Sequence, residues 1–143
     1  MRSARVRLWH VPLRVVTGAF IVNSGLQKRT AGRERAEALQ HLASGAYPEL
    51  AQVEPMRFTH NLSRVELALG GALLCPVVPT AVVGAALTAF SVSLLGLYWR
   101  TPELHEAGSP RPTDQGVPFA KDSWMLAIGI ALLVDGVDTR DRP

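Results

Sequence analysis

Cysteine and suitably placed histidine are scarce in this sequence of 143 residues. The single cysteine, Cys75, excludes an internal disulfide, a Cys-x-x-Cys redox pair and a cysteine-based metal site. A haem held between helices needs inward ligands at a common depth. The histidines instead fall at the ends of expected helices or in connectors, at positions His10, His41, His60 and His105. No nucleophile is paired with a base, so we expect no catalytic activity of its own, no metal and no resident cofactor.

Charge is missing from a long stretch in the middle of the chain. Although 19% of all residues are charged and 48% are hydrophobic, the 35 residues from Val65 to Trp99 contain one acidic side chain, Glu66, and no basic one. A membrane crossing needs about 20 mainly apolar residues, so this run, broken by the prolines of CPVVPT, predicts two crossings and a tight turn. A soluble four-helix bundle is the alternative, but helices that are apolar on every face suit lipid better than water.

The basic residues flank the apolar segments. A net charge of +3 and a pI of about 9.6 would fit a nucleic-acid-binding protein only if arginine and lysine shared a polar patch with aromatic side chains. They do not, so we expect the lipid bilayer, and not nucleic acid, as the partner.

Four membrane-crossing helices account for the hydrophobic segments. They are expected at residues 8–26, 58–74, 80–99 and 117–137, which predicts an all-α, polytopic four-transmembrane-helix bundle formed by residues 1–143 as one domain in the cell membrane. An even number of crossings places both termini and the turn near residue 77 on one face, called side A, and the two long connectors on the opposite face, side B. Counting basic residues favours side B in the cytoplasm, whereas the dense N-terminal arginines favour side A.

The two connectors differ in composition. The first contains RERAEALQHLASG, which predicts a short amphipathic helix, either lying on the membrane surface or simply solvated. The second, RTPELHEAGSPRPTDQGVP, is rich in proline and predicts ordered loop.

Small residues recur on one face of each expected helix. Helices in lipid pack through small and polar residues, so these faces are the predicted contact surfaces, and we expect them to converge on one axis. Their glycines are Gly18, Gly25, Gly70, Gly84, Gly129 and Gly136.

Polar and ionisable side chains gather toward side B when depth is counted at about 1.5 Å per residue. The expected cluster consists of Asn23, Lys28, His60, Glu66, Lys121 and Asp122. A buried unpaired carboxylate costs a few kcal/mol, so Glu66 should pair with Lys28 or Lys121, or else be protonated. Two interpretations stay open: the cluster lines a polar pocket for a small ligand or proton, or it has the structural role of holding the helices of the bundle together.

Arg14 lies too close to side A to reach that cluster. Near side A the last helix offers Asp135, so we expect an Arg14–Asp135 ion pair that ties the first helix to the fourth. The alternative is that Arg14 snorkels to the membrane surface without a partner.

Four stretches of the chain resemble the DoxX family of small four-helix membrane proteins. They are LRVVTGAFIVNSGLQK, VELALGGALL, LGLYWRTPELHEAGSPRPTDQGVPFAKDSWML and AKDSWMLAIGIALLVDG. The resemblance implies a four-helix bundle in the cell membrane, and it carries the polar positions of the family over to Arg14, Asn23, Lys28, Glu66, Lys121 and Asp122.

Some members of that family are associated with membrane redox systems. The resemblance therefore implies an accessory or ligand-binding subunit that holds a quinone or lipid-like molecule or docks a soluble oxidoreductase. The alternative is a small proton-coupled carrier that uses Glu66 and Asp122 as titrating groups. Such carriers are usually larger than this chain, so a carrier would be expected to act as a homo-oligomer.

Overall fold

Residues 7–138 are described by the computed structural model, and they fold almost entirely into helices. The longer helices are α1 (His10–Arg29), α2 (Arg33–Ala46), α3 (Pro55–Leu74), α4 (Thr80–Arg100) and α6 (Asp122–Asp138); shorter ones are η1 (Pro48–Gln52), η2 (Pro102–Leu104) and α5 (Val117–Ala120). No β-strand forms within residues 7–138. The all-α fold is confirmed. The ends of the first three expected helices differ from the observed ones by no more than three residues, as at Arg29 instead of 26 and Pro55 instead of 58. The segment expected at 117–137 is divided at Lys121 into α5 and α6.

Local sequence explains where α3 begins and ends. Its first helical residue is Pro55, which suits a position whose amide has no helical partner, and the Glu54 side chain accepts a hydrogen bond from the Arg57 amide at 2.8 Å. At the other end Pro76 and Pro79 lack amide hydrogens, so neither can continue a helical ladder. A tight turn therefore joins α3 to α4.

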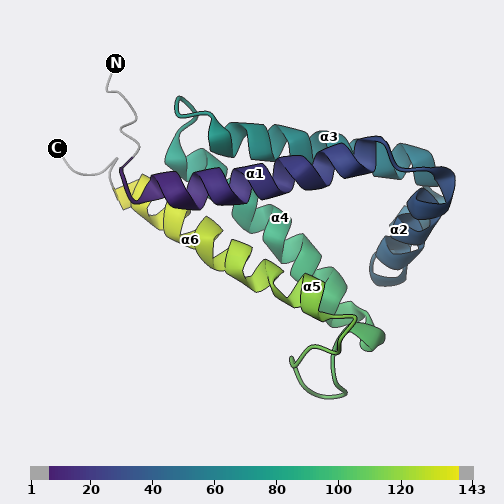
Figure 1. Ribbon diagram of the computed structural model, residues 1–143. Helices are drawn as coiled ribbons and strands as arrows, with labels where there is room; N and C mark the ends of the chain where they lie inside the picture. Colours follow the sequence, from purple (N-terminus) through teal and green to yellow (C-terminus); the bar gives the residue numbers. More distant parts are fainter. Residues whose placement is uncertain (1–6, 139–143) are drawn as a thin grey trace.

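The long helices form two antiparallel pairs that diverge from one end of the molecule. Figure 1 shows α1 beside α3 in one arm and α4 beside α6 in the other. Close backbone contacts between the arms are few, so the glycine faces meet within each pair. Side chains of all four helices nevertheless share one hydrophobic core, formed by Ile21, Leu69, Leu73, Val83, Leu87 and Leu132. The arms meet where α1 begins, α6 ends and α3 turns into α4. The prediction that both termini share one side concerns residues 1–6 and 139–143, which lie outside the described part of the chain.

Glycine contacts hold each pair together. The Gly18 carbonyl oxygen lies 2.8 Å from the place that a Cβ atom of Gly70 would occupy, so α1 and α3 touch through their backbones. A Cβ atom on Gly84 would collide with the backbone at Leu133, and one on Gly136 with Ala81, so α4 and α6 are packed as closely. The small-residue faces were therefore predicted correctly as contact faces.

Helix α2 crosses the open end between the arms (Figure 1). Its inner face buries Ala36, Ala43 and Ala46, while its outer face is charged and exposed. The Tyr47 hydroxyl donates to the Ser93 carbonyl at 2.8 Å, which fastens the end of α2 to α4. The amphipathic segment is thus a bracing helix of the fold.

The connector between α4 and α5 is ordered around His105. Its ring stacks on Trp99 at a centroid distance of 5.0 Å, and the Tyr98 hydroxyl donates to the Pro110 carbonyl at 2.7 Å. The His105 ring nitrogens face the backbone carbonyls of Glu106 at 3.0 Å and Trp99 at 2.9 Å. Because carbonyls only accept, both nitrogens can donate only in the charged ring, which raises the pKa of His105 above its ordinary value.

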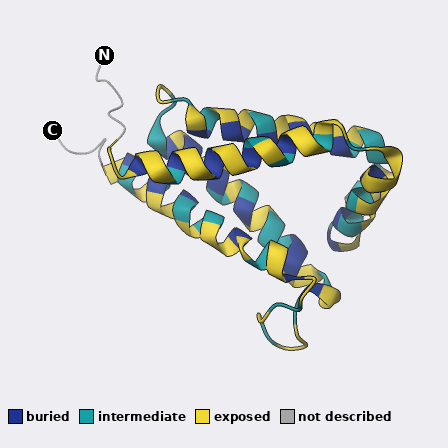
Figure 2. Cartoon of the chain, in the orientation of Figure 1, coloured by how far each residue is buried: buried dark blue, intermediate teal, exposed yellow. Residues whose placement is uncertain are grey.

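Many large apolar side chains are exposed on the outer faces, in addition to those buried in the core. Large apolar side chains project outward, among them Val16, Val134 and Trp124 at 69%, 62% and 73% exposure, whereas Arg14 and Glu66 are buried. Figure 2 shows exposed residues along the outer faces of both arms. Two helical segments in the described chain, Thr80–Arg100 and Val117–Asp138, are long and apolar enough to cross a membrane. This distribution favours a lipid environment.

Candidate functional site

A cavity of about 710 Å³ lies between the diverging arms at the side B end. All the longer helices contribute to its walls, with Ile21 from α1, Leu42 from α2, Leu62 from α3, Leu94 from α4 and Met125 from α6. The lining is mainly apolar, and the volume lies within the range of roughly 300–1,000 Å³ typical of small-molecule sites. The hydrophobic core near side A ends where this cavity begins.

Lys28 and Glu66 form an ion pair in the cavity wall. The Lys28 ammonium lies 3.1 Å from Glu66 Oε1 and donates to the Ser24 hydroxyl at 2.7 Å. The two side chains are 15% and 6% exposed, so both charges are largely removed from solvent. The prediction that Glu66 pairs with Lys28 is confirmed.

One oxygen of that carboxylate has no partner. Within residues 7–138 the buried side-chain oxygens without a hydrogen bond belong to Thr59, Glu66 and Ser91, and of these only Glu66 is a cavity-lining residue. Leaving a buried acceptor unsatisfied costs roughly 1–3 kcal/mol. Glu66 Oε2 is therefore a buried acceptor without a hydrogen bond on a residue that lines the cavity.

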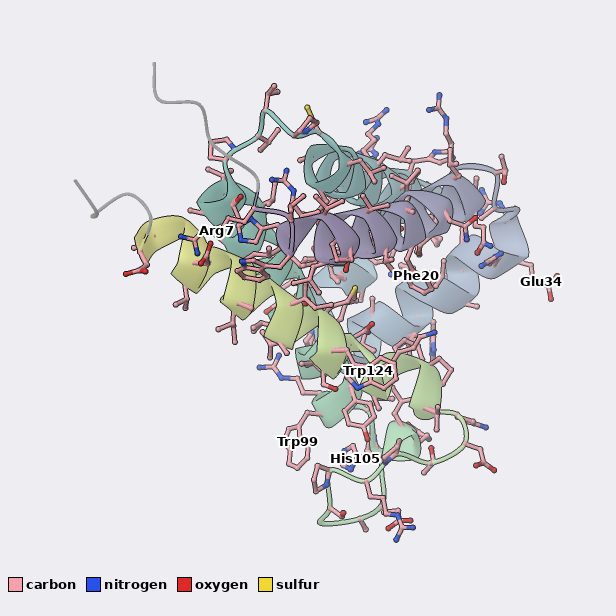
Figure 3. The ribbon with its side chains drawn as sticks, turned by 60° about the vertical axis from the view of Figure 1, so that its left-hand side comes forward. Arg7, Phe20, Glu34, Trp99, His105 and Trp124 are labelled. Atoms are coloured by element: carbon pink, nitrogen blue, oxygen red, sulfur yellow. The ribbon has the colours of Figure 1, made fainter. Side chains whose placement is uncertain are left out.

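Lys121 and Asp122 complete the ionisable lining on the opposite arm. Asp122 is buried at the start of α6, and its carboxylate interacts electrostatically with Lys121, Glu66 and Lys28. The Lys121 ammonium lies 5.1 Å from the centre of the Phe20 ring, which links α1 to α6 across the mouth of the cavity. The Phe20 side chain lies beside the gap between the arms (Figure 3). These four groups carry two positive and two negative charges, and Glu49 adds a third carboxylate to the lining.

Asn23 and His60 do not join this group. Both side chains are exposed, and neither lines the cavity. Their depth is suitable, but the helical phase of each residue turns it to the outside of the α1–α3 pair. The expected cluster is therefore corrected to Lys28, Glu66, Lys121 and Asp122.

Arg14 binds backbone carbonyls and not a carboxylate. Its five N–H groups face five acceptors: the carbonyls of Leu73 at 2.9 Å, Ala72 at 3.0 Å, Cys75 at 2.8 Å and Val78 at 3.2 Å, and the Thr80 hydroxyl at 3.5 Å. These carbonyls belong to the last turn of α3 and the following loop, where helical donors run out and the helix dipole is negative. Arg14 thus caps the C-terminus of α3.

The expected Arg14–Asp135 pair is corrected accordingly. Asp135 accepts from Arg7 at 2.8 Å and lies 2.9 Å from the His10 ring nitrogen, so α1 and α6 are joined one turn closer to side A than predicted. Figure 3 shows Arg7 at the end of the molecule where α6 finishes. The predicted link between the first and last helices through Asp135 is present, but Asp135 contacts Arg7 and His10 in place of Arg14.

Sequence reasoning missed two contributors to the cavity. Tyr47 and Phe20 were not candidates, because a single aromatic residue near the end of a helix, like Tyr47, or in the middle of an apolar helix, like Phe20, has many ordinary roles. The spacing of Ser24 and Lys28, four residues apart on one helix, was a usable signal for the hydrogen bond that orients Lys28.

Comparison of this chain with protein-family models, with curated proteins and with solved structures gives no match. The cavity and its ionisable groups are thus the features from which a function can be proposed.

Proposed function

We propose that this chain is a four-helix integral membrane protein of the DoxX type that binds a quinone or another lipid-like molecule between its helix pairs. The observation that carries the proposal is the cavity of about 710 Å³, which is apolar in its walls and has the Lys28–Glu66 ion pair at one side. Amphiphilic ligands require this combination, with apolar walls for the body and a few polar groups that orient the head.

The redox role in this proposal comes from the sequence resemblance. Such a chain would be an accessory subunit that presents the bound molecule to a soluble or membrane oxidoreductase, and it would have no catalytic activity of its own. Arg14 and Asp135 would be structural in this scheme, because their contacts lie at the opposite end of the molecule from the cavity.

The experiment that tests ligand binding uses the full chain purified in mild detergent. Solvent extraction followed by mass spectrometry should recover a quinone or lipid at near-stoichiometric amount. Glu66→Gln should lower its retention, because a neutral amide binds Lys28 and the ligand less strongly than a carboxylate does. Glu34→Gln is the matched control, since Glu34 projects from α2 away from the cavity (Figure 3). Equal retention by both variants and the parent would refute the proposed site.

Four crossings are part of the proposal. Helices α1 and α3 carry more polar residues than α4 and α6. Arg14 and Glu66 are turned inward and Val15 and Val16 face outward, while exposed polar residues such as Arg64 lie in the side B half of these helices. Thiol labelling in a Cys75→Ser background should give matching access for Leu8→Cys and Asp138→Cys. Cysteines at Ser44 and Ser109 should give the opposite access. Any other grouping would contradict four crossings.

A proton-coupled carrier is the second candidate. The observation that favours it is the placement of two carboxylates, Glu66 and Asp122, in the lining of one cavity. Intramembrane carboxylates commonly serve in proton relays. Purified protein in vesicles loaded with a pH-sensitive dye would then move protons with its substrate, and Asp122→Asn would abolish that flux. A vesicle preparation that retains ligand but passes no protons excludes the carrier.

A further inference from the structure

A second hollow runs along the outside of the molecule between α3 and α4. This groove has a volume of about 580 Å³ and is lined by residues of the two facing helices, among them Ala68, Ala72, Val82, Ala86 and Ala89. The two helices touch each other only sparsely, and four of these five side chains are exposed. In a bilayer such a groove opens directly into the hydrocarbon region.

The groove and the cavity share part of their walls. Val65, Phe90 and Ser93 line both hollows, so the groove continues from the cavity toward side A. Along α4 the combined lining extends from Leu97 to Val82, which is about 22 Å at a rise of 1.5 Å per residue. This length suits an extended hydrocarbon chain.

The cavity and the groove, which together form one continuous track, differ in polarity. In the groove the only polar residue is Ser93, whose hydroxyl already donates to the Phe90 carbonyl at 2.7 Å. In the cavity the Glu66 carboxylate has an unpartnered buried oxygen, and Lys28 uses two of its three N–H bonds on Ser24 and Glu66. A ligand that follows the track therefore has its hydrogen-bonding head in the cavity and its chain in the groove.

The charges in the cavity limit the head group further. Lys28 and Lys121 stand against three carboxylates in the lining, those of Glu49, Glu66 and Asp122, so an anionic head would add an uncompensated negative charge to an apolar site, whereas a hydroxyl adds none. The free carboxylate oxygen requires a donor, such as a hydroxyl, since a carboxylate only accepts.

We propose that the ligand is an amphiphile with an uncharged, hydroxyl-bearing head that donates to Glu66 Oε2, and with a hydrocarbon chain that leaves the cavity past Val65 and Phe90 into the α3–α4 groove. The inference rests on the proposed function, namely that the cavity holds a lipid-like molecule, and it adds the head-group chemistry and the route of the chain. Acylglycerols and membrane quinols both have this chemistry.

The test of the chain route uses two neighbouring alanines of α4. Ala86 lines the groove, and the exposed Ala85 does not. Binding of 1-monooleoylglycerol and of the shorter 1-monooctanoylglycerol is measured on the full chain in nanodiscs. Ala86→Phe should raise the Kd of the long probe at least tenfold and that of the short probe less than threefold, while Ala85→Phe changes neither more than twofold.

The test of the head uses probes that share one chain. Methyl oleate lacks the hydroxyl donor and oleate carries a charge, so each should bind at least tenfold more weakly than 1-monooleoylglycerol. Glu66→Gln should weaken 1-monooleoylglycerol at least fivefold and methyl oleate less than twofold. Decylubiquinol and decylubiquinone test whether the natural ligand is a quinol or an acylglycerol. Tighter binding of decylubiquinol than of 1-monooleoylglycerol indicates a membrane quinol, and the reverse indicates an acylglycerol. Equal binding of quinol and quinone overturns the donor requirement.

Other outcomes separate this inference from the proposed function. If Glu66→Gln weakens binding but Ala86→Phe does not, the ligand is bound by another route and the chain placement is wrong while the proposed function stands. If Ala86→Phe changes the oligomeric state and leaves both probe affinities intact, a second copy of the chain occupies the groove. If no probe binds in a way that depends on Glu66, the proposed function fails as well.

Discussion

Replacing Arg14 of α1 by leucine should destabilise the protein, because it removes the side chain that caps the C-terminus of α3. The guanidinium of α1 is the donor for the last carbonyls of α3. The helical partner of the Ala72 carbonyl would be the amide of residue 76, which is a proline and has no hydrogen. Leucine would leave the Leu73 and Ala72 carbonyls without a donor in an apolar environment, whereas the Cys75 carbonyl would keep its bond from the Val78 amide.

The expected size of the loss follows from the two bonds to Leu73 and Ala72. Hydrogen bonds to a charged group contribute about 1.5–3 kcal/mol each, so these two contribute about 3–6 kcal/mol. Leucine costs less than arginine to place in apolar surroundings, by up to roughly 2.5–3.5 kcal/mol on insertion scales, which offsets part of this loss. A net loss of about 2–3 kcal/mol remains, and this lowers the melting temperature by about 5–10 °C.

Thermal unfolding in detergent measures this effect. Arg14→Lys should give an intermediate melting temperature, because an ammonium has three N–H groups in place of five. Arg64→Leu is the matched control, since Arg64 is an exposed arginine on the outer face of α3. If Arg14→Leu melts within 2 °C of the parent and of this control, the carbonyls do not depend on Arg14 and the capping account is wrong.

Three further predictions concern other parts of the fold. In a double-mutant cycle, His10→Ala and Asp135→Ala should show a coupling energy of about 0.5–3 kcal/mol, and simple additivity would contradict the contact between α1 and α6. Gly84→Ala should force α4 away from α6 and lower the melting temperature, whereas Gly71→Ala, which meets no neighbouring atom, should leave it unchanged or raise it slightly. Because the pKa of His105 is raised in the folded protein, its charged ring stabilises the connector fully at pH values below the ordinary pKa of 6.5. This contribution to stability is lost as the pH rises through the folded pKa. An NMR titration midpoint at or below 6.5 would contradict the two carbonyl contacts.

The helices and their contact faces were predictable because both depend on local pattern. Apolar segments of sufficient length, ended by proline, set the bounds of α4 and the turn before it. Glycine spacing identified the faces that carry Gly18 and Gly84, since a close helix contact needs a residue without a side chain. Counting depth along the helices was also sufficient to bring Lys28 to Glu66.

Pairing of the helices was not predictable from the same patterns. A small-residue face shows that a helix has a close neighbour but does not identify the neighbour, so the chain can form two pairs as well as a single bundle. Arg14 was matched to an acid because carbonyls at a helix end carry no signature in the sequence. Asn23 and His60 have the right depth, but their orientation about the helix axis differs from that of Lys28 and Glu66.

The cavity is a consequence of where the two helix pairs are joined. At side A, Arg14 links α1 to the turn that begins the other pair, and Asp135 links α6 back to the start of α1. At side B the arms are held instead by α2 through Tyr47, and by the contact of Lys121 with Phe20. Two helix pairs that are joined at one end and held apart at the other by a crossing helix leave space between them. The same geometry places Glu66 between the arms, paired with Lys28 and away from the apolar outer faces.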